Sequence, residues 1–372
     1  MSRDYAGSDV DSAEEVPPNQ HSRAFSGADM PRLAEEPRMG DYFQKRRDLL
    51  NILKSLHSTG IQNELDLPQI VVIGSQSVGK SSLIESMSGV CCYTEFWDVY
   101  PPYPRSVDTA EVASRYWNMH QMPNGMPAPV RGRLVLQDIT TIPFGSTLYN
   151  AEDVEKMLRR AQRAILRPDL DPTLFLDDSD LHVFGVPMTF SRNCVCIQVT
   201  GPNVPDLYFY DLPGIIANVG DGGNVADIKL VEDLAKSYIK RPNCIVLLVI
   251  TCETDFENQG AGRLVLKDPS LRQRTIGVLT KVDRIEFGGA SKWLRMLRGE
   301  DQPLMHGWYC VKQRDMAQLQ EGISWEEARS YETEFFQTMA PWADLNRVER
   351  QRLGSQKLAD RLGTILSDLV SK

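Results

Sequence analysis

A short stretch near residue 80 places small and hydroxyl residues around one lysine, a combination that suits phosphate binding. Its members are Gly74, Ser75, Gln76, Ser77, Val78, Gly79, Lys80, Ser81 and Ser82. The first eight follow the P-loop pattern G-x-x-x-x-G-K-[ST], in which the glycines let successive backbone N–H groups point at phosphate oxygens. An apolar strand is predicted before them, over Ile70–Ile73, and a helix from Ser81, whose N-terminus favours anions. We expect Lys80 to reach the β- and γ-phosphates of a nucleotide and the Ser81 hydroxyl to bind Mg²⁺.

A second pair of residues follows the apolar run Leu207–Tyr210, which predicts another strand. Asp211 ends that run, and Gly214 lies three residues further on, in a D-x-x-G pattern. A carboxylate at a strand end can hold Mg²⁺ through water, and a glycine leaves its N–H free to meet a γ-phosphate. A turn after any strand can show the same pattern. Because this one lies downstream of the P-loop, we favour a metal site with Ser81 and Asp211 as ligands.

The residues Thr280, Lys281 and Asp283 follow a further apolar run, Thr275–Leu279, and predict which base is bound. An ionised carboxylate only accepts hydrogen bonds, and guanine offers a ring N–H and an exocyclic amino group side by side. Adenine presents an acceptor at the ring position, which would leave a buried carboxylate unpaired at a cost of roughly several kcal/mol. We therefore expect Asp283 to select guanine and the Lys281 stem to lie over the base.

These three groups must be brought together by the elements around them. Apolar runs alternate with helical patterns along the chain, which favours a mostly parallel central sheet with helices on both faces. The predicted strands are Ile70–Ile73, Leu134–Leu136, Val195–Val199, Leu207–Tyr210, Ile245–Ile250, Thr275–Leu279 and Tyr309–Val311. The predicted helices are Lys80–Met87, Ala151–Ile165, Asp227–Ile239, Glu326–Thr338 and Ser355–Val370. The expected fold class is α/β, with the ligand at the carboxyl ends of the strands.

The two ends of the chain differ in composition from its centre. Residues 1–38 are rich in Ser, Asp, Glu, Pro and Gly and show no apolar periodicity, which predicts a disordered acidic segment. One domain is expected over residues 39–372, with a flanking helix at 39–60 and C-terminal helices at 324–372. The last helix carries an apolar stripe, which favours a buried packing face over a partner-binding helix. Its members are Leu358, Leu362, Ile365, Leu366 and Leu369.

The overall composition argues against several functions. A net charge of −9 disfavours a broad nucleic-acid interface and binding to anionic lipid through charge alone. The longest apolar run, Cys244–Ile250, is far short of the roughly 20 residues that cross a bilayer, so we expect no direct membrane insertion. The N-terminus lacks the apolar core of a signal peptide, which predicts a cytoplasmic location. Cys194 and Cys196 are expected to be structural rather than zinc ligands.

The wider sequence resembles the dynamin family over about residues 40–370. The resemblance rests on Gln76-Ser77 in the P-loop, Asp211–Ile215, Thr254-Asp255 and Arg272–Asp283. It looks like the fungal and Mx-like branch, in which a phrase similar to Arg159–Ile165 also occurs. The resemblance implies a P-loop GTPase fold that binds GTP or GDP with Mg²⁺ and hydrolyses GTP.

The resemblance also implies roles for particular residues. In dynamins the P-loop residues that match Gln76 and Ser77 place the attacking water and a monovalent cation, K⁺ or Na⁺, once two GTPase domains dimerise. Asp255 matches a position that reaches toward the partner's base, so a homodimer is expected. Ile215 stands where small signalling GTPases have a water-orienting Gln. A base-contacting loop should follow Tyr309–Val311, and Lys312 is the expected contact there, although Lys312-Gln313 replaces the family's Asn-Arg.

Two features depart from the family pattern. Residues 91–109, after the predicted P-loop helix, lack the glycines that dynamins carry in the loop that closes over the nucleotide. Thr109 is the expected ligand of Mg²⁺ and holder of the water, with Thr94 as the alternative. We therefore expect weak GTPase activity, and the alternative function is a GTP-binding regulatory module with little or no hydrolysis.

The second departure is length, because dynamins continue into a long helical stalk and this chain stops at Lys372. We therefore expect a GTPase domain without a stalk. The predicted helix Phe43–Leu56 would lack its usual partner helices, so self-association is expected. An association with membranes or microtubules is implied only by the resemblance to the family.

Overall fold

The computed structural model describes residues 68–89, 110–112, 142–149, 151–167, 169–176, 194–197, 199, 207–216, 225–286 and 288–370. The acidic segment 1–38, the helix at 39–60, the strand Leu134–Leu136, and both Thr94 and Thr109 lie outside these residues. The predictions made for them therefore stay predictions.

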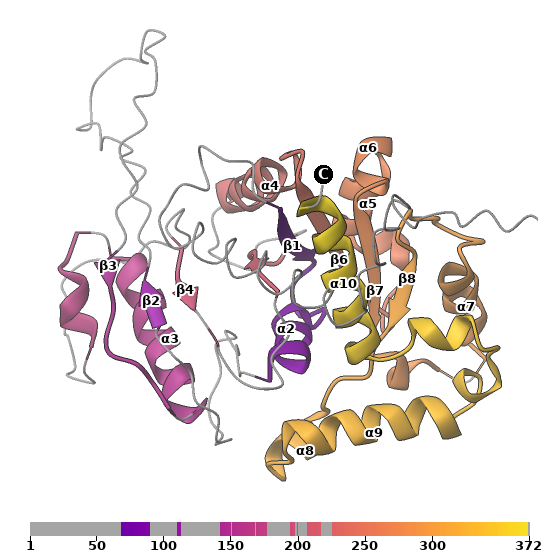
Figure 1. The fold of residues 1–372 in the computed structure, drawn as a ribbon. Coiled ribbons are helices and arrows are strands. Elements are labelled where there is room, and N and C mark those ends of the chain that lie inside the picture. The colour runs from indigo at the N-terminus through magenta and orange to yellow at the C-terminus, as the bar shows by residue number, and fades with distance from the viewer. Residues whose placement is uncertain are drawn as a thin grey trace, which may run out of the picture. The chain divides into compact units, whose positions relative to one another are not determined.

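The centre of the structure is a five-stranded parallel sheet in the order β5-β1-β6-β7-β8 (Figure 1). The strands are β1 (Gln69–Gly74), β5 (Phe209–Asp211), β6 (Cys244–Thr251), β7 (Thr275–Thr280) and β8 (Trp308–Cys310). Every residue of β1, β6 and β7 is buried, which agrees with their continuous apolar runs. The predicted α/β class with a parallel sheet is confirmed.

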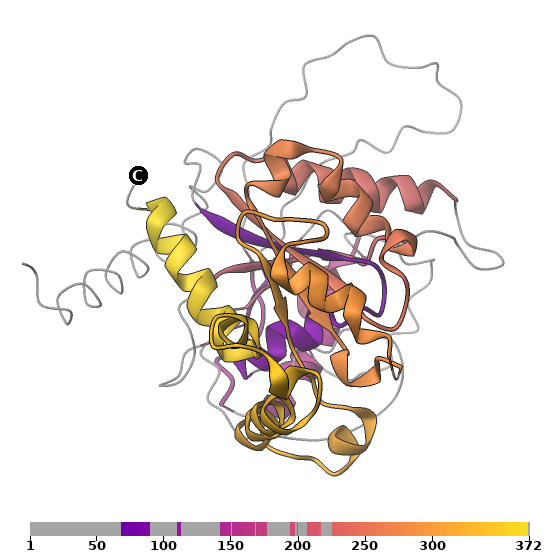
Figure 2. The same ribbon diagram turned by 90° about the vertical axis from the view of Figure 1, so that its right-hand side faces the viewer.

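Helices cover both faces of this sheet. On one face Val71 and Ile73 of β1 join a core with α4 (Val225–Ile239), α5 (Gly260–Leu266) and α7 (Ala290–Arg298). On the other face Ile70 and Val72 pack with α2 (Lys80–Ser88) and α10 (Ser355–Val370). Side chains of a strand alternate between faces, so one apolar run supplies both cores. Figure 2 shows α10 and α4 on opposite sides of the sheet.

The C-terminal helices behave as their sequence patterns predict. Leu358, Leu362, Ile365 and Leu366 of α10 are buried, which confirms the packing face. The helix α9 (Trp325–Thr338) begins at a capping box, in which the Ser324 side chain accepts from the Glu327 N–H at 3.1 Å. The other short elements are α6 (Pro269–Arg272), α8 (Met316–Gln320), η3 (Phe256–Asn258), η4 (Val282–Arg284), η5 (Trp342–Asp344) and η6 (Glu349–Arg352).

A separate antiparallel sheet contains three short strands in the order β3-β2-β4. They are β2 (Ala110–Val112), β3 (Ile142–Pro143) and β4 (Cys196–Ile197). The strand predicted over Val195–Val199 therefore forms as β4, but it does not join the parallel sheet. Helix α3 (Ala151–Ile165) and η2 (Pro172–Phe175) share a small core around Phe144 and Phe175. Among the described helices, none is both long and apolar enough to cross a bilayer.

Candidate nucleotide-binding site

The P-loop connects the end of β1 to the start of α2. Two of its residues have a positive φ, Ser77 at 59° and Gly79 at 92°, and a positive φ is uncommon for a residue with a side chain. At Gly74, an added Cβ would lie 2.7 Å from both the Val249 carbonyl oxygen and the Val78 side chain. The loop therefore turns so tightly that glycine is required where it leaves the strand.

The lysine of the loop is folded back over it. Lys80 is 8% exposed, and its Nζ donates to the Ser75 carbonyl at 3.0 Å. The loop is also fastened to the sheet, because the Thr280 hydroxyl at the end of β7 donates to the Val78 carbonyl at 2.6 Å. Thr280 was predicted from its motif as part of the nucleotide site, and in the structure it holds the P-loop in position.

The D-x-x-G segment lies against the P-loop. The Ile215 N–H donates to the Gly74 carbonyl at 3.0 Å, and Ser75 and Ile215 form a parallel bridge. A Cβ added to Gly214 would come within 2.7 Å of the Gln76 Cα. The backbone of Gly214 therefore approaches Gln76 more closely than a side chain would permit.

The two predicted metal ligands are in contact. The Ser81 hydroxyl donates to the Asp211 carboxylate at 3.0 Å. Asp211 is exposed at the end of β5. The protein atoms around its carboxyl group partly desolvate it and so raise the pKa of Asp211, while Lys80 and the Ser81 hydroxyl oppose that rise. A cation between the two side chains would favour the ionised carboxylate still further. Hydroxyl and carboxylate oxygens suit Mg²⁺, which at nucleotide sites uses one or two protein ligands beside water and phosphate.

No cluster of three or more His, Cys, Asp or Glu side chains suited to a metal occurs in the described part of the chain. Cys194 and Cys196 are half-buried, and the Cys194 sulfur lies 3.6 Å from the Tyr238 hydroxyl.

One cleft joins the P-loop to the residues that follow β7 and β8. It is lined by Ser77, Gly79–Ser82, Lys281, Asp283, Arg284, Gln313–Met316 and Leu319. The P-loop and the predicted base-reading residues thus share a single surface at the carboxyl edge of the sheet, where α/β proteins bind their ligands. Lys281 has a positive φ of 56°, so the backbone turns sharply as it enters this cleft.

In the loop after β8, Gln313 and Arg314 line the cleft, whereas Lys312 was the expected contact. The Lys312 N–H donates to the Glu332 carboxylate at 2.9 Å and its Nζ lies 3.4 Å from the Gln318 side-chain oxygen, so Lys312 lines a neighbouring cavity. The next residue, Gln313, reaches the P-loop and donates to the Gly79 carbonyl at 2.8 Å. Gln313 and Arg314 line the nucleotide cleft, and their place after a parallel strand was the signal that could have found them.

The strand β1, the P-loop and the helix α2, with the Ser81–Asp211 contact and with Asp283 lining the same cleft as the P-loop, define a P-loop nucleotide-binding domain. Comparison with known proteins places it further. The model of the family described as "Dynamin family" matches residues 146–282, and that of the "Dynamin central region" matches residues 292–372, together more than half of the chain. The chain belongs to the dynamin family.

The curated proteins that the chain resembles include several with names that describe GTP-binding proteins. The chain is 30% identical to interferon-induced GTP-binding protein Mx1 of Mus musculus over 332 residues, which are 89% of this chain and 46% of that protein. It is 29% identical to Mx1 of Equus caballus (92% of this chain, 46% of that protein) and 30% identical to Mx2 of Macaca mulatta (89% and 41%). The chain thus spans less than half the length of these relatives. A match over 89% of the chain necessarily includes the P-loop at 74–81.

Proposed function

We propose that this chain binds GTP with Mg²⁺ and hydrolyses it to GDP and phosphate. The observation that carries the proposal is the shared cleft, which is lined at once by the P-loop residues Gly79–Ser82 and by Lys281 and Asp283. A cleft that ended at the P-loop would suit any phosphate compound, whereas one that continues to Asp283 has the means to read a base.

The phosphate end of the cleft stabilises negative charge. In this proposal Lys80 and the backbone N–H groups at the start of α2 would bind the β- and γ-phosphates, and phosphoryl transfer depends chiefly on such charge stabilisation. Ser81 and Asp211 would hold Mg²⁺ in this proposal, and Mg²⁺ would neutralise charge that develops on the phosphate oxygens.

The base end of the cleft favours guanine. Asp283 is exposed in the cleft and can accept hydrogen bonds from the ring N–H and the amino group of guanine. Lys281 would lie over the base. The names of the Mx relatives describe GTP-binding proteins, which supports this assignment.

The attacking water needs a residue other than Ile215. The Ile215 side chain packs against the apolar core, and its N–H is used by the Gly74 carbonyl. Gln76 lies against Gly214 and Ser77 lines the cleft, so we propose that these two residues place the water and a K⁺ or Na⁺ ion. Thr109, or Thr94 in its place, completes the proposal as a ligand of Mg²⁺.

We further propose that the active form is a homodimer of GTPase domains in the cytoplasm. Asp255, the residue proposed to reach the partner's nucleotide, lies on the exposed surface and forms an ion pair with Lys292 at 2.5 Å. A surface pair of this kind contributes little energy and can be exchanged for another contact.

The test is turnover of GTP by the purified full chain with Mg²⁺ and K⁺ over a range of protein concentrations, with ATP as the control nucleotide. We expect turnover of GTP, weak or absent turnover of ATP, and a rate per molecule that rises with concentration. Tight binding of GTP with no turnover at any concentration would contradict hydrolysis and leave a GTP-binding regulatory module. Equal binding of ATP would contradict the assignment of Asp283.

A further inference from the structure

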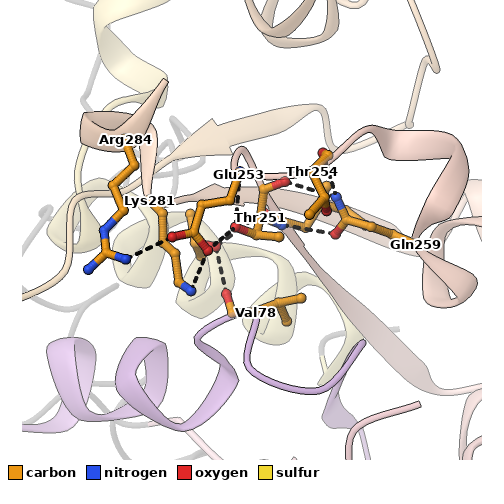
Figure 3. Close-up of polar contacts among 9 residues, drawn as sticks. Val78, Thr251, Glu253, Thr254, Gln259, Lys281 and Arg284 are labelled. Carbon is orange, nitrogen blue, oxygen red and sulfur yellow. Dashed lines mark hydrogen bonds and ion pairs between the residues drawn. The ribbon is translucent and has the colours of Figure 1, made fainter. Parts of the chain in front are cut away.

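The loop that follows β6 is held rigidly beside the proposed base site. The buried Gln259 side chain accepts from the Thr251 N–H at 3.0 Å and donates to the carbonyls of Thr251 and Thr254, at 2.8 and 3.2 Å (Figure 3). The Glu253 N–H also donates to the Thr251 hydroxyl at 3.2 Å. The residues on both sides of Glu253 are therefore held by the Gln259 side chain. The Thr251 hydroxyl also donates to the Glu253 carboxylate, at 3.4 Å.

The Glu253 carboxylate is directed at two cations that line the nucleotide cleft. One oxygen lies 2.6 Å from the Lys281 Nζ and the other lies 2.8 Å from the Arg284 guanidinium, as Figure 3 shows. Burial alone would raise the pKa of Glu253, but the hydrogen bonds from Lys281 and Arg284 outweigh it, and the pKa lies below its usual value. The carboxylate is therefore ionised at neutral pH.

We propose that Glu253 is a positioning residue for the base, because it pins the Lys281 ammonium and so fixes the Lys281 stem as one wall of the base site. This inference rests on the proposed function. A lysine side chain has four rotatable carbon bonds, and ordering it only when the nucleotide arrives would weaken binding. The positive φ of Lys281 sets the direction in which the side chain leaves the backbone, and Glu253 fixes its far end.

Glu253 also keeps Lys281 away from a competing partner. Lys281 and Asp283 line the same cleft, and a released ammonium group could pair with the carboxylate that is proposed to read guanine. Because the Lys281 ammonium group pairs with Glu253, it does not pair with Asp283, and the Asp283 carboxylate stays available to the base.

If Glu253 only stabilised the fold, its loss would lower the melting temperature rather than the nucleotide affinity. Its side chain is 30% exposed, and exposed ion pairs contribute little to stability. Since Gln259 already holds the loop, loss of the Glu253 carboxylate should leave the melting temperature almost unchanged. Nucleotide affinity is therefore the measurement that separates the two roles.

The experiment compares the full chain with its Glu253→Gln variant by measuring Kd for GTP, GDP and ITP, and kcat for GTP. We expect Kd to rise about 3- to 10-fold for all three nucleotides and kcat at saturation to stay within about twofold, because ordering of one long side chain is lost before binding. The ratio of GTP to ITP affinity should not change, since ITP lacks only the amino group that Asp283 reads. Glu257→Gln, an exposed glutamate on the same loop, is the matched control and should leave Kd unchanged.

A second comparison tests whether Glu253 acts through Lys281. Lys281→Met keeps most of the apolar stem and removes the ammonium, so adding Glu253→Gln to this variant should change Kd no further. An unchanged Kd in Glu253→Gln, or an equal further loss in the Lys281→Met background, would overturn the inference. A wild-type chain that binds ATP as well as GTP would instead overturn the proposed function, and this is measured first.

Discussion

Asp283 is the residue on which selection of the base depends in the proposed function. Replacing it with Asn exchanges an acceptor for a group that can also donate, and xanthine carries a carbonyl where guanine carries its amino group. We expect Asp283→Asn to weaken GTP binding by about 10- to 100-fold, in line with one or two lost charged hydrogen bonds, and to strengthen XTP binding. Competition between labelled GTP and unlabelled XTP measures both changes.

The control for this prediction is Asp344→Asn, an exposed aspartate on η5 outside the cleft. Its affinities for GTP and XTP should equal those of the wild type. If Asp283→Asn keeps the wild-type preference for GTP, Asp283 does not read the base.

Ser81 and Asp211 give a prediction about the metal. Ser81→Ala removes a hydroxyl that contacts Asp211 and is expected to raise the Mg²⁺ concentration for half-maximal turnover at least about tenfold. Ser86→Ala, on the same helix but outside the cleft, is the control. Equal Mg²⁺ titrations of the wild type and Ser81→Ala would remove Ser81 from the proposed metal site.

At the level of elements, the loop after β8 and the start of α10 are joined by one buried carboxylate. Glu332 of α9 accepts from the Lys312 N–H at 2.9 Å, and from the Ser355 N–H and hydroxyl at 2.9 and 2.6 Å. Glu332→Ala would leave these buried donors unpaired, so we expect a loss of about 2–4 kcal/mol of unfolding free energy. Urea denaturation of the variant measures it, and a loss of less than about 1 kcal/mol would contradict this role.

The same residue predicts a dependence of stability on pH. Burial raises the pKa of Glu332, although hydrogen bonds from Ser355 and Lys312 oppose the rise. A carboxyl group with a raised pKa in the folded state stabilises the fold below the ordinary Glu value, and this contribution is lost as pH rises through the raised pKa. Between the ordinary Glu pKa and the raised pKa of Glu332, the free energy of unfolding of the wild type should therefore fall relative to that of Glu332→Gln as pH rises. Urea denaturation of both proteins across this pH range measures the difference, and a constant difference would contradict the prediction.

Most helices and strands could be predicted, because the spacing of apolar residues in the sequence matches the faces that these elements bury. The buried runs predicted over Ile70–Ile73 and Ile245–Ile250 are β1 and β6, and the helices Ala151–Ile165 and Ser355–Val370 have the predicted bounds. Val195–Val199 shows the limit. Its apolar run predicts a strand, but the sheet that a strand joins depends on residues far away in the sequence.

The candidate site shows the same division. The P-loop, Asp211 and Asp283 follow local patterns, so their approximate places were predictable. The place of Gln313 after a strand was a usable signal, but its contact with the Gly79 carbonyl was not predictable, because that contact joins segments 234 residues apart. Glu253 carries no motif, and only the fold brings it within 2.6 Å of the Lys281 ammonium.

At the scale of the whole molecule, the proposed dimer gives a prediction about concentration. Asp255→Ala should abolish the rise of GTP turnover per molecule with protein concentration and leave Kd for GTP unchanged, since Asp255 would act on the partner's nucleotide. Asp360→Ala, an exposed aspartate on α10, is the control. Turnover of Asp255→Ala that still rises with concentration would remove Asp255 from the proposed interface.

The parallel order of the sheet also has a consequence for synthesis of the chain. The neighbours of β1 are β5 and β6, which begin at Phe209 and Cys244, 135 and 170 residues after Gly74. At about 5–20 residues per second, the ribosome completes β1 roughly 7–27 s before it starts the nearer partner. During that interval the nascent chain exposes an apolar strand with unpaired edges, which is a target for chaperones and for aggregation. A polypeptide released before Phe209 would hold every P-loop residue and still lack the neighbouring strands that shape them into a loop.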